Sequence, residues 1–166
     1  MTGTQATEDV LVRPLERLEQ ALEMKFPGHE SEWSENIRTT LANLEQALRL
    51  HGAGVEGPDG LFSKVDLTRP TLARQVSELR REHRELLQQA HALQGRVQTA
   101  AQAFDSSMQP LTESNSLPKP AGDTGVPDFG VIRQEASQLV AVLHRHLDDE
   151  ARLILDSVNT DIGVGD

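Results

Sequence analysis

Residues 139–158 read LVAVLHRHLDDEARLILDSV, and this stretch decides the fold. At the 3.6-residue period of an α-helix, apolar residues in and just before it form one face, made of Ala136, Leu139, Val140, Leu143, Leu147, Ile154 and Val158. His146 and Glu150 lie within or beside this face, four residues apart, so their side chains point the same way. Because a carboxylate in a dry core needs a partner, Glu150 indicates a polar site inside the fold.

Composition and charge limit the classes of function. The chain has 166 residues, with 26 acidic and 16 basic side chains and a formal net charge of −10. A broad basic surface for nucleic acid or for an anionic membrane is therefore not expected. The absence of cysteine excludes disulfides, thiolate metal ligands and a cysteine nucleophile. Without a signal-peptide pattern or a membrane-spanning apolar run, we expect a single cytoplasmic domain.

Two amphipathic helices are predicted in the first third of the chain. The first spans about 8–26, follows a loose polar tail at 1–7, and ends at a Pro-Gly pair. The second begins near Ser31 or Ser34. Its apolar residues recur at alternating steps of four and three, the spacing of a seam, meaning the row of side chains that faces the other helices of a bundle. The glycine-rich segment 52–60 should loosen or end this helix.

A third and longer helix is predicted in the middle of the chain. Its seam continues from Leu72 to Phe104 in unbroken steps of four and three. Asp66 or Thr68 is expected to cap its start, with Pro70 in its first turn.

A long connection separates this third helix from the fourth. Residues 105–130 are rich in proline and glycine and have no periodicity, which predicts a flexible crossover loop or a lid. The fourth helix then spans 128–158, and 159–166 form a tail. Four amphipathic helices predict an all-α fold, an up-down four-helix bundle over residues 8–158.

Histidine and glutamate occur where these seams should be apolar. His51 lies in the seam of the second helix, His83 in that of the third, and His146 with Glu150 in that of the fourth. Imidazole and carboxylate groups that face one another from several helices are suitable ligands for iron and similar metal ions. The plain structural alternative is a buried hydrogen-bonded network between Glu150 and the histidines.

Two further carboxylates are candidate ligands. Glu19 lies inside the apolar face of the first helix, and Glu56 follows His51 by five residues, so that it can fold back over the site. The alternatives without a metal are that Glu19 lies at the edge of the apolar face and that Glu56 is solvated in the glycine-rich loop. His144 lies beside the apolar face of its helix and is expected at the surface.

Three segments together resemble hemerythrin-like domains, the HHE cation-binding family. They are LRLHGAGVEGPDGLF at 48–62, LRREHRELL at 79–87 and LHRHLDDEARLIL at 143–155. The resemblance covers the second to fourth predicted helices. It implies a non-haem diiron centre between four helices, with metal ligands at His51, Glu56, His83, His146 and Glu150.

The sequence departs from the family pattern at two places. The family has a histidine in its first helix, where 8–26 has none, and a second histidine in its third helix, where this chain has Leu87. Glu19 is the residue able to replace one of these ligands. The alternatives are therefore a carboxylate-rich iron site, a site for one ion, or a site that has lost its metal.

Two functions follow from this reading. The first is a hemerythrin-like metal-binding protein that binds O₂ or nitric oxide at iron, or acts in iron or oxidant handling, without catalysis. The alternative is a metal-free bundle that serves as an interaction or sensory module, with a structural or pH-responsive histidine network and a protein partner bound through 105–130. A hydrolase is not supported, since neither a nucleophile elbow nor an HExxH motif occurs.

Overall fold

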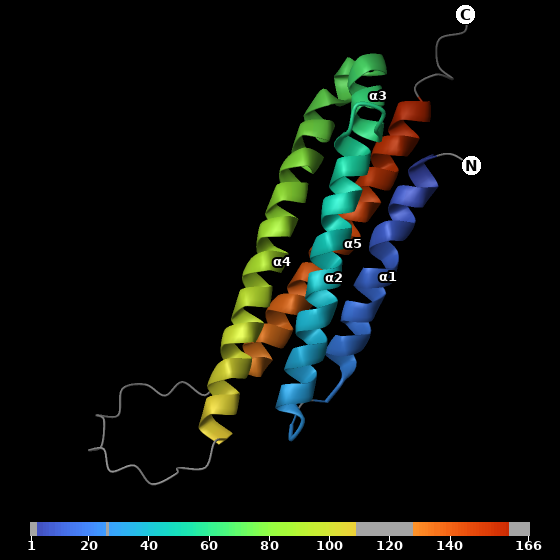
Figure 1. Cartoon of the computed structure of the whole chain (residues 1–166). Helices are drawn as coiled ribbons and strands as arrows, with labels where there is room; N and C mark the ends of the chain where they lie inside the picture. Colours follow the sequence, from blue (N-terminus) through green and yellow to red (C-terminus); the bar gives the residue numbers. More distant parts are fainter. Residues whose placement is uncertain (1–2, 26, 109–127, 160–166) are drawn as a thin grey trace, which may run out of the picture.

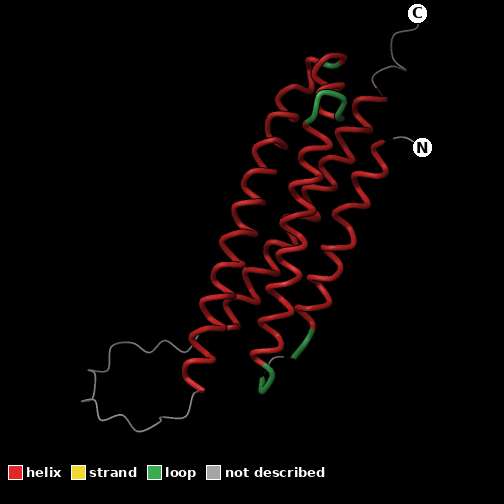
Figure 2. Tube along the Cα trace, viewed as in Figure 1, coloured by secondary structure: helices red, strands yellow, loops and turns green. Residues whose placement is uncertain are grey.

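Four long helices pack as an all-helical bundle in the computed structural model, which describes residues 3–25, 27–108 and 128–159. They are α1 (Gly3–Glu23), α2 (Glu30–Glu56), α4 (Ala73–Met108) and α5 (Phe129–Asn159). Contacts join α2 to both α1 and α4, and α5 to both α4 and α1, so the helices form a closed ring. Successive long helices run in opposite directions (Figures 1 and 2). The described ranges contain no strand.

The seams of α2 and α4 are buried as their spacing predicts. Every position at steps of four and three is buried from Ile37 to Val55 in α2 and from Val76 to Ala100 in α4, including His51 and His83. A repeat of 3.5 residues keeps one row of side chains facing the neighbouring helices along the whole bundle. The polar side chains in that row are therefore carried into the core.

The buried face of α5 differs from the prediction at its C-terminal end. Leu153 is fully buried, whereas Val158 is 61% exposed. Because the packed row again follows steps of three and four, it passes from Leu143 through His146 and Glu150 to Leu153. Both polar residues therefore lie in the seam itself.

A short helix that the sequence pattern did not predict follows α2. Residues Leu61–Thr68 form α3, and Pro70–Leu72 form the 3-10 turn η1 that leads into α4. Asp66 and Thr68 therefore lie inside α3 and do not cap α4; Asp66 pairs with Arg80 at 3.0 Å. Phe62 and Val65 of α3 are buried in a second apolar cluster with Val55, Val76, Leu79 and Leu153, so α3 covers one end of the bundle.

The helix ends differ from the predicted limits in several places. Since 3–7 have no glycine or proline break after Gly3, α1 begins there and not at residue 8, with Pro14 inside it. α2 continues through Gly52 and Gly54 and ends at Glu56. Asp128 caps α5 as its boundary predicted, since its Oδ1 accepts hydrogen bonds from the backbone of the next helical turn. Most of the predicted 105–130 loop lies outside the described residues.

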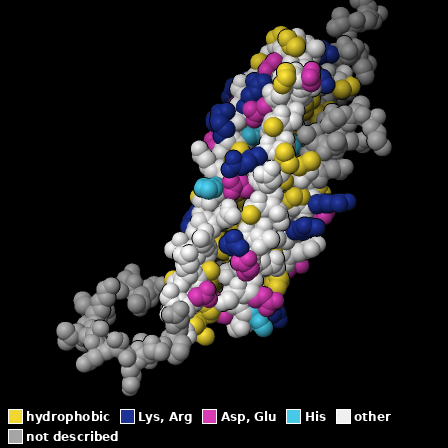
Figure 3. All heavy atoms as spheres, in the orientation of Figure 1, with side chains coloured by type: hydrophobic (Ala, Val, Ile, Leu, Met, Phe, Trp, Pro, Cys, Tyr) yellow, Lys and Arg dark blue, Asp and Glu magenta, His cyan; other side chains and the backbone are white. Residues whose placement is uncertain are grey.

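The surface is mixed in charge. On the face drawn in Figure 3, acidic and basic side chains are interspersed along the bundle with scattered hydrophobic ones. Within the described ranges, no helix has the length and apolar character needed to cross a membrane.

Candidate metal centre

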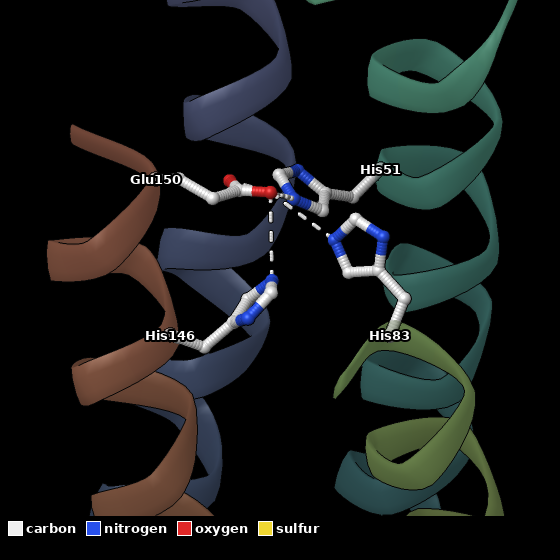
Figure 4. A group of neighbouring side chains, drawn as sticks. All are labelled: His51, His83, His146 and Glu150. Carbon is white, nitrogen blue, oxygen red and sulfur yellow. Dashed lines mark hydrogen bonds and ion pairs between the residues drawn. The ribbon is translucent and has the colours of Figure 1, made fainter. Parts of the chain in front are cut away.

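Three imidazoles and one carboxylate meet inside the bundle. His51 comes from α2, His83 from α4, and His146 and Glu150 from α5 (Figure 4). Their exposed fractions are 0%, 3%, 1% and 3%. One ligand atom from each residue lies within 4.8 Å of the others. The four side chains that the seam positions singled out are thus brought together from three helices.

The Glu150 carboxylate is the point on which the rings converge. The Nε2 atom of His51 lies 3.1 Å from Oε1 and 3.0 Å from Oε2 of Glu150. His83 Nε2 lies 3.1 Å from the same Oε1, and His146 Nε2 lies 3.4 Å from it. Every ring therefore turns the same nitrogen toward one small region, as Figure 4 shows.

The protonation of the cluster follows from this contact. Burial by itself would raise the pKa of the Glu150 carboxyl, but the imidazoles of His146, His51 and His83 that contact it hold that pKa far below its ordinary value. Burial would lower the pKa of His146, yet the neighbouring carboxylates of Glu150 and Glu82 raise that pKa overall. Glu150 is therefore ionised, and the metal-free cluster favours a protonated His146.

One nitrogen in the cluster has an unmet hydrogen-bonding capacity. His146 Nε2 is buried and makes no hydrogen bond with any described residue, although it lies 3.4 Å from Glu150 Oε1. Buried polar atoms in folded proteins nearly always have a partner, and an orphan calls for an explanation such as a bound ion or water. This atom points to a ligand that completes the cluster.

Two carboxylates contact the rings from outside the cluster. Glu56 Oε1 lies 2.6 Å from His83 Nδ1, and Glu82 Oε2 lies 2.9 Å from His146 Nδ1. Glu56, which the sequence singled out as a metal ligand, thus faces the ring nitrogen opposite to the one that faces Glu150. The seam pattern does not single out Glu82 as a site residue; its one signal in the sequence is its position directly before His83.

Glu19 does not join the cluster. Its Oε1 lies 2.7 Å from His144 Nε2, and the two side chains are 39% and 55% exposed. The expectation that Glu19 supplies a missing ligand is therefore not met, because it lies at the border of the apolar face of α1. Leu87, four residues after His83 in α4, packs against the main apolar core.

Apolar side chains shield the cluster at one end of the bundle, while Glu82 connects it to the surface. The Phe62 ring of α3 stacks on His83 at a centroid distance of 5.6 Å. A surface pocket of about 450 Å³ is lined by Glu82 together with Glu78, Asp149 and Arg74. The side chain of Glu82 thus lies between solvent and His146.

Comparisons with protein-family models, curated proteins and solved structures find no match for this chain. The buried cluster of His51, His83, His146 and Glu150 can hold a metal ion, and the functional argument depends on its geometry.

Proposed function

We propose that this protein is a hemerythrin-like metal-binding protein that holds non-haem iron between α2, α4 and α5. The observation that carries the proposal is the convergence of three imidazole Nε2 atoms on one buried carboxylate. Its ligands are His51, His83, His146 and Glu150. The up-down order of the four long helices agrees with the arrangement that the resemblance implies.

The dimensions of the cluster suit a metal ion. Bonds from nitrogen or oxygen ligands to a first-row metal are about 2.0–2.2 Å long, so ligand atoms around one ion lie roughly 3–4 Å apart. The ligand atoms here lie within 4.8 Å of one another, so small side-chain movements suffice for binding. The buried Nε2 of His146, which has only a long 3.4 Å contact with Glu150 and no hydrogen bond, would gain a close partner.

The ligand set favours a single ion. Three imidazoles and one carboxylate, without sulfur, suit iron, manganese or zinc. The carboxylates that could hold a second ion have other partners: Glu56 contacts His83 Nδ1, and Glu19 contacts His144. Leu87, where the family resemblance implies a further histidine, has no ligand atom and packs against the apolar core. We therefore propose one iron where the family resemblance implies two.

The resulting function is the binding of a small diatomic ligand, O₂ or nitric oxide, or the handling of iron and oxidants. His51, His83, His146 and Glu150 would hold the iron, and with only four protein ligands the bound ion would supply a site for such a ligand. The surrounding apolar clusters, including Phe62 and Leu153, limit the access of bulk water.

Metal content tests the proposal. The protein is purified without an affinity tag from iron-rich medium, and its metals are quantified by mass spectrometry. We expect about one iron per chain, lost in the double variant His83→Ala with His146→Ala and retained in His144→Ala, which removes an exposed histidine. Equal, substoichiometric metal in all three proteins would overturn it.

One observation favours the metal-free alternative, an interaction or sensory module. Glu150 already has hydrogen bonds to His51 and His83, so much of the cluster satisfies itself without an ion. Under this alternative, the metal-free protein binds no added Fe²⁺, Mn²⁺ or Zn²⁺, and the double variant loses stability without losing metal.

A further inference from the structure

Two ligand histidines have their far nitrogens held by carboxylates outside the cluster. His83 Nδ1 contacts Glu56, and His146 Nδ1 contacts Glu82, at 2.6 and 2.9 Å. The rings are at most 4% exposed, whereas the Glu56 and Glu82 side chains are 33% and 32% exposed. Each carboxylate therefore lies between a buried ring and the solvent.

We propose that Glu56 and Glu82 are positioning residues, which set the tautomer and orientation of His83 and His146 for metal binding. This inference rests on the proposed metal site. A neutral imidazole has one N–H and one lone pair, and an ionised carboxylate can only accept a hydrogen bond. For metal binding, the Nε2 atoms that face Glu150 must be unprotonated. A carboxylate at Nδ1 then holds the remaining N–H on the far side of the ring and leaves the lone pair on Nε2 for the metal.

The contacts cross between helices. Glu82 and His83 are neighbours on α4. Glu82 contacts the ring of His146 on α5, whereas the ring of His83 is contacted by Glu56 at the end of α2. Each ring is thus oriented by a residue of a different helix. The consecutive Glu82 and His83 serve two roles, one as an orienting carboxylate and one as a ligand.

The same contact also occurs away from the cluster, which provides a matched control. Glu19 lies 2.7 Å from His144, but both side chains are substantially exposed and neither belongs to the group of four ligand residues. Glu78 is a second control, because it lines the same surface pocket as Glu82 and pairs with Arg74.

The test measures Co²⁺ binding to the full chain after removal of metal with a chelator. Dissociation constants come from competition with a chromophoric chelator, and the visible spectrum of bound Co²⁺ reports on ligand geometry. We expect Glu56→Ala and Glu82→Ala each to weaken binding by about 10- to 100-fold and to change the spectrum. Glu19→Ala and Glu78→Ala should change affinity by less than about twofold.

Glutamine variants separate positioning from a structural role. The side-chain carbonyl of Gln can accept the same Nδ1–H bond, so Glu56→Gln and Glu82→Gln should recover most of the lost affinity and the wild-type spectrum. Circular dichroism of the metal-free variants verifies that they fold. If the wild type binds Co²⁺ but the alanine variants bind it equally well with the same spectrum, the inference is overturned while the metal site stands. If the wild type binds no metal, both proposals are overturned.

Discussion

The ring of Phe62 stacks on the ring of His83, with centroids 5.6 Å apart and planes inclined by 19°. Phe62 is fully buried, and the guanidinium of Arg80 lies over its ring. Through this contact the short helix α3, which contributes no ligand, holds one wall of the candidate metal site.

Removing this ring should weaken the fold and the site together. Phe62→Ala is expected to lower the free energy of unfolding by about 3–5 kcal/mol, because it leaves a cavity beside His83. Urea unfolding of the metal-free protein measures this change. Leu67→Ala, at an 84% exposed position of the same helix, should change stability by less than about 0.5 kcal/mol. If Phe62→Ala lowers the free energy of unfolding by no more than Leu67→Ala does, the role assigned to α3 is contradicted.

Glu150→Gln should destabilise the metal-free protein and prevent metal binding. The carboxylate faces three imidazoles in a buried position, so removing its charge is expected to cost about 3–5 kcal/mol where His146 is protonated. The matched variant is Glu19→Gln, which neutralises a carboxylate beside an exposed histidine and should cost less than about 1 kcal/mol. Chemical unfolding at pH 6 measures the free energy of unfolding of both variants. Equal decreases would show that Glu150 stabilises the fold no more than the exposed Glu19 does.

The stability of the metal-free protein should depend on pH in both directions. The pKa of His146 is raised from 6.5, so its stabilising contribution is complete below that pH and is lost as the pH rises through the folded-state pKa. The pKa of Glu150 is lowered from 4.5, so its contribution is present above that pH and is lost as the pH falls through the folded-state pKa. Thermal unfolding should therefore show greatest stability between about pH 4.5 and 6.5.

Bound metal should oppose the loss of stability that the metal-free protein shows as the pH rises above 6.5. A metal ion needs the unprotonated Nε2 of each histidine, so the added stability from metal should grow as the pH rises above 6.5. The variant His146→Gln removes the titrating ring, and its metal-free form should lose the alkaline decline. An unchanged decline in this variant would assign the pH dependence to other groups.

Close packing at Gly60, in the turn before α3, can be tested by comparison with Gly95 of α4. A Cβ atom at Gly60 would overlap the carbonyl oxygens of Gly54 and Val55, so Gly60→Ala is expected to cost about 1–3 kcal/mol. Gly95 lies in α4 with no atom within 4 Å of the added carbon, so Gly95→Ala should stabilise the protein by about 0.5–1 kcal/mol. Opposite signs of the two changes in urea unfolding are the expected result, and equal signs would contradict the packing described at Gly60.

The sequence predicted the buried cluster of three histidines and one glutamate better than its surroundings. Steps of four and three carry His51, His83 and Glu150 into the core because a seam residue faces inward wherever the repeat is unbroken. The eight residues of α3 are too few for a periodic signal, and the cover that it provides was therefore missed. The contact of Glu82 with His146 depends on how α4 and α5 are rotated relative to each other, which spacing along one helix does not determine.

The order of the ligands along the chain has a consequence for biosynthesis. His51 and His83 are synthesised before α5, to which His146 and Glu150 both belong. A chain shortened before α5 would keep two of the four proposed ligands and lack the carboxylate on which the rings converge. Under the proposed function, metal uptake therefore has to follow the synthesis and docking of α5, because the earlier helices supply only two of the four proposed ligands.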